Sequence, residues 1–251
     1  MIALRLISIA LAFTFFACST EKKASDKEKS LLHLQMGTSY LMKGSYPQAL
    51  RELLDAERLD PNNPTIQNNL GLAYLVRGKI DEAEVRFTKA LSLDSKYTDA
   101  RNNLGRLYID VGFLDKAIIE LEKAASDLTY EEPEKSWANL GQAYFLSAQY
   151  EKAKIAFHNS LKGRKENCFT MNYYGKTLFE LKQYKTASQS LDQAIRLCQK
   201  TPLDEPHFYS GLSFYKLGDL EQARARFKEL LVLHPKSKYV QKANEILEIM
   251  K

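Results

Sequence analysis

The chain has 251 residues, of which 45% are hydrophobic and 27% are charged, and it contains only 11 Gly and 7 Pro. The scarcity of these two helix-breaking residues favours a long helical array over two conventional globular domains. The formal net charge is +5, and basic and acidic residues are interleaved along the chain. This pattern does not support a nucleic-acid-binding surface, so we expect no nucleic acid among the partners.

The N-terminus has the layout of a secretory signal. Arg5 supplies a positive charge, residues 6–17 (LISIALAFTFFA) form an apolar run, and Cys18 follows. The run is shorter than the roughly 20 residues that a membrane-spanning helix needs. The segment Phe15–Cys18 (FFAC) resembles the lipobox of bacterial lipoproteins, in which the cysteine is acylated and becomes the mature N-terminus. An uncleaved anchor or ordinary secretion is the alternative.

The lipobox resemblance implies a lipoprotein signal peptide at 1–17 and lipidation of Cys18. Residues 18–29 are polar and charged, and they are predicted to form a flexible tether after the acylated N-terminus. Ser19 follows the cysteine. By resemblance to the sorting rule of Gram-negative lipoproteins, Ser19 implies an outer-membrane, lipid-anchored protein whose folded part lies in the periplasm.

One motif recurs through the rest of the chain. A glycine repeats at intervals of 34 or 36 residues, and an alanine follows each of these glycines by twelve positions. The pattern, carried by Gly37, Gly71, Gly105, Gly141, Gly175 and Gly211, resembles the tetratricopeptide repeat, a helix-turn-helix unit of 34 residues. The resemblance implies an all-α fold, a right-handed superhelical solenoid over residues 30–251. Its predicted parts are six repeats (30–63, 64–97, 98–133, 134–167, 168–203 and 204–237) and a C-terminal capping helix over 238–251.

The residue types of the motif predict how the helices pack. Glycine in a helix interior costs about 1 kcal/mol relative to Ala, so its recurrence needs a compensating contact. We expect the small Gly and Ala side chains to let the two helices of a repeat approach, and the Phe or Leu sixteen residues after each glycine to fill the space between successive hairpins. Extra residues before Pro133 and Pro206 predict longer loops, with each proline at the start of a helix.

Cysteine and histidine positions bear on stability and chemistry. Cys168 begins the first helix of the fifth repeat and Cys198 lies near the end of its second helix, so the antiparallel pair predicts a possible disulfide, with two separate thiols as the alternative. The histidines form no spaced ligand pair, and no catalytic motif is present. We therefore expect a protein that is not an enzyme and has no cofactor and no metal.

The first helices of such a superhelix line its concave side, so residues two or three before and one after each glycine are predicted to point into a groove. These positions are rich in side-chain amides, which donate to and accept from a peptide backbone simultaneously. With neighbouring aromatic residues, they predict a partner-binding groove made of Asn68, Asn69, Asn102, Asn103, Arg106, Asn139, Gln142, Phe145, Asn172, Tyr173, Lys176, Phe179 and Tyr215. Docking of a folded partner and a purely structural role of the amides are the alternatives.

The combination of a lipobox and six repeats resembles the type IV pilus biogenesis lipoproteins of the PilW/PilF type, the pilot proteins of secretins. The segment Leu128–Gly141 (LTYEEPEKSWANLG) is similar to that family at the corresponding point. The resemblance implies a protein-binding scaffold that binds secretin subunits and promotes their assembly or membrane insertion. The alternative is a periplasmic lipoprotein adaptor that recruits envelope proteases or peptidoglycan enzymes.

Overall fold

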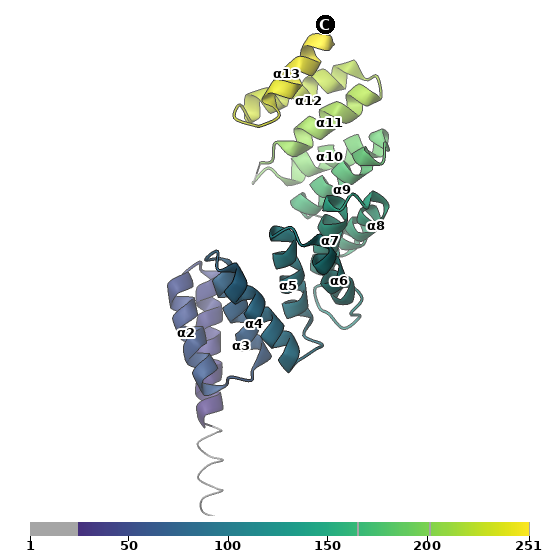
Figure 1. The fold of residues 1–251 in the computed structure, drawn as a ribbon. Coiled ribbons are helices and arrows are strands. Elements are labelled where there is room, and N and C mark those ends of the chain that lie inside the picture. The colour runs from purple at the N-terminus through teal and green to yellow at the C-terminus, as the bar shows by residue number, and fades with distance from the viewer. Residues whose placement is uncertain (1–24, 165, 201, 251) are drawn as a thin grey trace, which may run out of the picture. The chain divides into compact units, whose positions relative to one another are not determined.

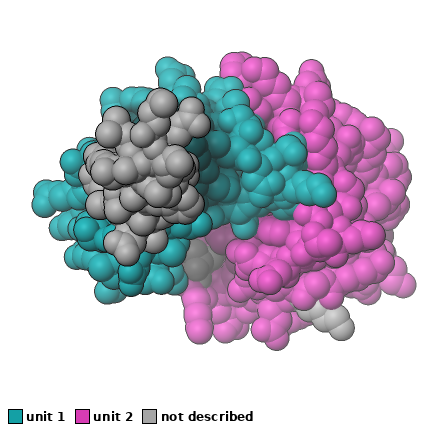
Figure 2. Space-filling view, turned by 90° about the horizontal axis from the view of Figure 1, so that it is seen from below, with its two compact units in different colours: residues 1–107 teal, residues 108–251 magenta. Residues whose placement is uncertain are grey.

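The computed structural model describes residues 25–164, 166–200 and 202–250, and these residues form α-helices joined by turns (Figure 1). The predicted signal peptide, the predicted lipidation site Cys18 and the first part of the predicted tether lie outside the described residues. The chain divides into two compact units, residues 1–107 and 108–251, which Figure 2 colours separately. The boundary falls within helix α5 (Thr98–Asp110).

Unit 1 begins with a helix over residues 25–42 and continues with α2 (Tyr46–Leu59), α3 (Pro64–Leu75), α4 (Ile80–Leu93) and the first part of α5. Helix α3 packs against both α2 and α4. A compact apolar core lies where α2 and α3 meet, and it consists of Leu53, Ala56, Ile66, Leu70 and Ala73. Burial of these side chains supplies the main stabilising free energy of this part of unit 1.

Unit 2 holds the end of α5 and a longer series of helices. These are α6 (Leu114–Ala125), α7 (Pro133–Leu146), α8 (Tyr150–Gly163), α9 (Cys168–Glu180), α10 (Tyr184–Leu197), α11 (Glu205–Lys216), α12 (Leu220–Leu233) and α13 (Val240–Ile249). Each packs against the next, and α9 also contacts α7 and α11. This stacking of helix pairs confirms the predicted all-α repeat fold. Within the described residues, no helix is both long enough and apolar enough to cross a membrane.

Helix α13 closes the C-terminal end of unit 2. It packs against α12, and its Ala243 and the following Met250 are buried in one cluster with Phe208, Phe227 and Leu230. In this cluster α13 covers the apolar face of the last repeat, as the next hairpin covers that of each inner repeat. The capping helix is therefore confirmed.

Polar side chains and prolines fix where several helices begin. The side chain of Asn63 accepts hydrogen bonds from the backbone N–H groups of Thr65 and Ile66 at the start of α3. At the start of α9, the side chain of Asn167 accepts one hydrogen bond, from the backbone N–H of Thr170. Pro133 is the first residue of α7 and Pro206 the second residue of α11, as predicted. Proline is suited to this place because the first N–H groups of a helix have no partner within the helix.

Glycines of the first helices lie against the large residue sixteen positions later in the chain. A Cβ atom at Gly71 would lie 2.5 Å from the ring of Phe87, and one at Gly141 would lie 2.6 Å from the ring of Phe157. The prediction that glycine allows a close approach is therefore confirmed. The same glycine contact recurs in Gly37–Leu53, Gly175–Leu191 and Gly211–Phe227. The large residue also lies between successive hairpins, as predicted, because the ring of Phe157 stacks on that of Tyr173 in the next hairpin with centroids 5.8 Å apart.

The turn inside each hairpin uses a left-handed backbone conformation. Four turns place glycine there, with φ between +71° and +81° at Gly44, Gly78, Gly112 and Gly218. In the fourth and fifth repeats the same position holds Ala148 (φ 57°) and Lys182 (φ 59°). A side chain in this conformation costs roughly 1–2 kcal/mol, so the hairpin geometry is kept even where the sequence does not favour it.

Candidate protein-binding site

The amides of unit 1 form a hydrogen-bonded ladder between first helices. Nδ2 of Asn69 donates to Oγ1 of Thr38 on helix 25–42 at 2.8 Å, and Nδ2 of Asn68 donates to Oδ1 of Asn69 at 3.2 Å. Nδ2 of Asn103 on α5 donates to Oδ1 of Asn68 at 2.9 Å. Asn68 and Asn69 are buried. Their placement matches the structural alternative, because their polar groups join neighbouring repeats instead of facing solvent.

The other predicted groove residues of unit 1 differ in exposure. Asn102 is buried, Asn103 is half-buried and Arg106 is exposed. Arg106 thus offers a free-standing charge on the side of α5, whereas the amides beside it contribute mainly to helix packing. The structure joins Asn68, Asn69 and Asn103 in the ladder and leaves Arg106 outside it.

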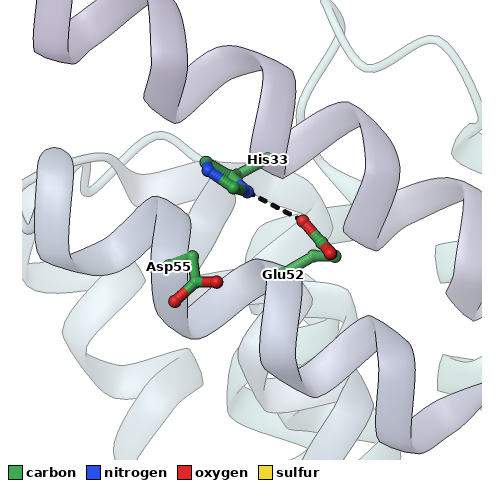
Figure 3. A group of neighbouring side chains, drawn as sticks. All are labelled: His33, Glu52 and Asp55. Atoms are coloured by element: carbon green, nitrogen blue, oxygen red, sulfur yellow. Dashed lines mark hydrogen bonds and ion pairs between the residues drawn. The ribbon is translucent and has the colours of Figure 1, made fainter.

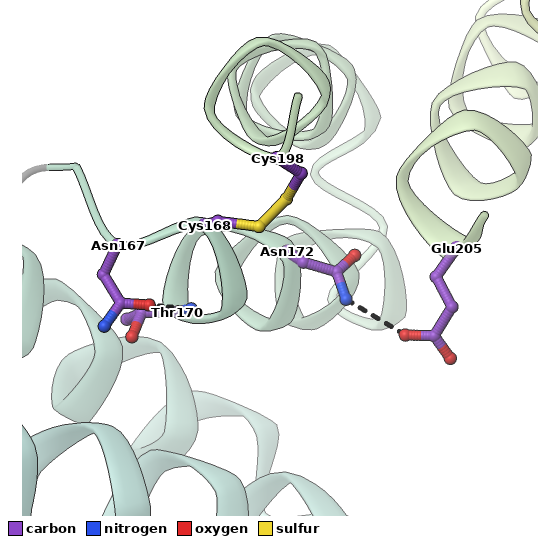
Figure 4. The surroundings of a disulfide bond; sticks show 6 residues. All are labelled: Asn167, Cys168, Thr170, Asn172, Cys198 and Glu205. Carbon is purple, nitrogen blue, oxygen red and sulfur yellow. Dashed lines mark hydrogen bonds between the residues drawn. A yellow bond between two sulfur atoms is a disulfide. The ribbon is translucent and has the colours of Figure 1, made fainter. Parts of the chain in front are cut away.

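In unit 2 a buried ion pair joins α9 to α11. Nζ of Lys176 lies 3.0 Å from Oε2 of Glu205, and Nδ2 of Asn172 donates to the same oxygen at 3.0 Å (Figure 4). The hydroxyl of Tyr239 donates to Oε1 of Glu205 at 3.0 Å, and Nζ of Lys238 lies 3.9 Å from it. One carboxylate therefore links α9, α11 and the segment before α13.

Aromatic rings surround the Lys176 ammonium group. Its Nζ lies 4.8 Å from the ring centroid of Tyr173, 5.2 Å from that of Phe145 and 5.5 Å from that of Tyr209. These distances are within the range of cation–π attraction, which is strongest where water is excluded. The Lys176 side chain is only 9% exposed, so the rings and Glu205 replace most of its hydration.

Burial and charge set the protonation of this network. The pKa of the Glu205 carboxyl lies below its ordinary value. Burial alone would raise this pKa, but the Lys176 ammonium and the hydrogen bonds from Asn172, Lys176 and Tyr239 together lower it by more than burial raises it. Burial, together with the Glu205 charge, raises the pKa of the hydroxyls of Tyr173 and Tyr239. Glu205 is therefore ionised and both hydroxyls are protonated at neutral pH.

The rings continue along the first helices of unit 2. Phe145 of α7 meets Tyr173 of α9 edge-on, with ring centroids 5.5 Å apart, and Phe179 of α9 meets Tyr209 of α11 in the same way at 5.4 Å. Each ring is half-buried and keeps part of its surface in solvent. We call this set, together with Gln142 and Lys176, the α7–α9–α11 surface.

The remaining predicted residues lie around this surface. Nε2 of Gln142 donates to the hydroxyl of Tyr173 at 3.4 Å. Asn139 on α7 is half-buried. Tyr215, like Tyr209, packs against the C-terminal cluster of α11, α12 and α13. The structure thus brings Phe145 of the fourth repeat together with Tyr173 and Lys176 of the fifth.

Cys168 and Cys198 form a disulfide that joins the start of α9 to the end of α10, with Cα atoms 5.1 Å apart (Figure 4). Near Cys198, a pocket of about 370 Å³ is lined by residues that include Ile195, His207 and His234. His207 is buried, and Oε2 of Glu229 lies 3.4 Å from its Nδ1 without forming a hydrogen bond. Burial lowers the pKa of His207 more than Glu229 raises it.

Family models of the tetratricopeptide repeat match four stretches of the sequence. They cover residues 37–76, 74–129, 134–162 and 207–237, which together make up more than half of the chain. The chain is a tetratricopeptide-repeat protein. Solenoids of this class offer extended surfaces to other proteins, so the chain is a protein-binding scaffold. No curated protein matches it significantly in sequence.

Solved structures share the fold of this tetratricopeptide-repeat protein. PilF of Pseudomonas aeruginosa is 22% identical, with a TM-score of 0.80, and the match covers 88% of this chain and 99% of PilF. PilW, a type IV pilus biogenesis factor, is 20% identical over 85% of this chain and 97% of PilW, with a TM-score of 0.75. YrrB, a tetratricopeptide-repeat protein with an unusual peptide-binding site, is 14% identical over 77% of this chain and 97% of YrrB, with a TM-score of 0.65.

Sequence reasoning missed Tyr209 of the α7–α9–α11 surface, and Glu205 and Tyr239 of the network beside it. Tyr209 lies two residues before Gly211, the same offset that identified Tyr173, so extending the offset rule to the sixth repeat would have found it. Tyr239 lies in the predicted capping segment 238–251 and is not among the predicted groove residues. Glu205 has no spacing signal, because it follows the extra residues between α10 and α11.

Proposed function

We propose that this tetratricopeptide-repeat protein is a lipid-anchored scaffold of the outer membrane that binds secretin subunits and promotes their assembly or insertion for type IV pilus biogenesis. The observation that carries the proposal is the similarity of the fold to PilF over 88% of this chain. The similarity to PilW is nearly as extensive, over 85% of this chain. The lipobox-like segment ending at Cys18 supports the lipid anchor.

In this proposal the α7–α9–α11 surface receives the partner. Its half-buried rings offer apolar faces, and they lose little conformational entropy when a partner binds because aromatic side chains have few rotatable bonds. The Lys176 charge is already balanced by Glu205. A segment with apolar or aromatic side chains therefore fits this surface better than a strongly acidic one.

Deletion of the gene tests the proposed function directly. We expect heat-resistant secretin multimers and twitching motility to be lost, and both to return when the wild-type gene is supplied. Intact multimers together with altered cell-wall turnover would instead support the adaptor of envelope enzymes and contradict the secretin role.

Photo-crosslinking locates the binding surface. A photoreactive amino acid at position 179, on the α7–α9–α11 surface, is expected to capture the secretin subunit. The matched control carries the same group at position 155, where Ile155 is 59% exposed on α8. Equal capture at both positions, or capture at 155 alone, would show that the partner docks elsewhere.

Two substitutions test the anchor. Cys18→Ser is expected to abolish acyl labelling and release the protein from the membrane fraction, whereas Ser19→Asp is expected to keep acylation but retain the protein at the inner membrane. Membrane fractionation measures both. Unchanged partitioning of Cys18→Ser would refute the lipid anchor.

A further inference from the structure

Three side chains with metal-ligating atoms converge in unit 1. His33 lies on helix 25–42, and Glu52 and Asp55 lie one turn apart on α2, so both carboxylates are on the same helix face (Figure 3). Nδ1 of His33 is 2.7 Å from Oε2 of Glu52. One ligand atom from each of the three side chains lies within 4.8 Å of the others.

The cluster carries an excess of negative charge in a sheltered place. The side chains of Glu52 and Asp55 are 17% and 26% exposed, and that of His33 is 33% exposed. Asp55 also pairs with Arg58, whose side chain is 77% exposed and is therefore strongly hydrated. Two sheltered carboxylates facing one imidazole attract a cation, because solvent screens their mutual repulsion only partly.

The donor atoms select the class of cation. One imidazole nitrogen and two carboxylate oxygens are typical ligands of Zn²⁺, which accepts mixed nitrogen and oxygen donors, whereas Ca²⁺ and Mg²⁺ bind oxygen ligands. Ligand atoms around a tetrahedral zinc, each about 2.1 Å from the metal, lie about 3.4 Å from one another. The ligand atoms now lie within 4.8 Å of one another, so metal binding requires side-chain rotation to reach that value.

We propose that His33, Glu52 and Asp55 form a binding site for Zn²⁺ or a similar divalent transition metal. Three protein ligands leave a fourth position for water or for a side chain of a bound protein. The metal would join helix 25–42 to α2 and thereby clamp the first hairpin of the array, next to the predicted tether. This site is independent of the proposed secretin role. It departs from the sequence-based expectation of no metal.

Zinc titration of the full-length chain tests the site. The chain carries Cys18→Ser in every sample, which removes the one cysteine outside the disulfide, and it is purified in detergent and treated with a chelator. We expect calorimetry to give one zinc ion per chain and thermal unfolding to shift to a higher temperature with zinc. His33→Asn and Glu52→Gln should each weaken binding at least tenfold.

The control is His158→Ala, which removes an exposed histidine of α8 outside the cluster and should leave zinc binding unchanged. Circular dichroism verifies that each variant is folded. Absence of stoichiometric zinc binding, undiminished binding by His33→Asn, or calcium binding as tight as zinc binding would each overturn the proposal.

Discussion

Replacing Glu205 by Gln tests the network that holds the α7–α9–α11 surface together. The substitution keeps the size of the side chain but leaves the Lys176 ammonium, 9% exposed, without its counter-ion. Removing one partner of a buried ion pair costs roughly 3–5 kcal/mol. Glu205 is 24% exposed and the rings around Lys176 remain, so we place the loss at the lower end, about 3 kcal/mol.

The measurement is equilibrium unfolding in denaturant, followed by the fluorescence of Trp137, the single tryptophan of the chain, which lies on α7 in the same unit. The control is Glu221→Gln, which removes an exposed carboxylate from the first turn of α12 and reports the loss of helix-dipole interaction alone, about 0.3–1 kcal/mol. The difference between the losses of unfolding free energy in the two variants gives the contribution of the Lys176–Glu205 ion pair.

Two further results would refute the reasoning about Glu205. Lys176→Met combined with Glu205→Gln should cost less than the sum of the single changes, because neither charge is then left alone; additive costs would mean that the pair is not coupled. The pKa of Glu205 is lowered in the folded state from 4.5. Its stabilising effect is therefore present above pH 4.5 and should disappear as the pH falls further. A cost that persists in acid would contradict the ionic explanation.

Three other predictions concern packing, covalent linkage and pH. Gly141→Ala gains about 1 kcal/mol of helix propensity but forces a Cβ into the ring of Phe157, so a net loss of about 1–2 kcal/mol is expected in denaturant unfolding; a stabilised Gly141→Ala protein would contradict the close contact. Reduction of Cys168–Cys198 reopens a loop with a sequence separation of 30 and should lower the unfolding free energy by about 3.6 kcal/mol, whereas the double Cys168→Ser/Cys198→Ala variant should not respond to reductant. Burial lowers the folded-state pKa of His207 from 6.5, so the stabilising contribution of the neutral imidazole is present above that pH and is lost on acidification. The melting temperature of His207→Gln should therefore fall less between about pH 7 and about pH 5 than that of the wild type. An equal fall would refute this assignment.

The glycine period was sufficient to predict the fold. Glycine recurs inside the first helices because a close contact with the second helix leaves no room for a side chain at that position of the repeat. The same period predicted only one of the two contacts of the large residue sixteen positions later. The ring of Phe157 stacks on Tyr173 of the next hairpin, as expected, and the structure adds that it also lies on Gly141 of its own hairpin. The left-handed turns at Ala148 and Lys182 were also invisible, since neither residue type favours that conformation.

The candidate site was predictable where a residue type follows the repeat register. Offsets from Gly175 identified Asn172, Tyr173 and Lys176, and the structure places all three around one network. Glu205 was not predictable, because its position depends on the path of the longer connection between α10 and α11. The role of Asn68 was also not predictable, since an amide suited to a peptide is equally suited to another amide.

The disulfide has a mechanical consequence. In a chain pulled from its two ends, a segment can lengthen only as far as its covalent path allows, up to about 3.4 Å per residue. The bridge between Cys168 and Cys198 removes a sequence separation of 30 from that path, which is roughly 100 Å of extension. Tension therefore passes through the two sulfur atoms and bypasses α9 and α10. Lys176 and Tyr173 lie within the bypassed segment, so this part of the α7–α9–α11 surface is shielded from a load carried along the chain.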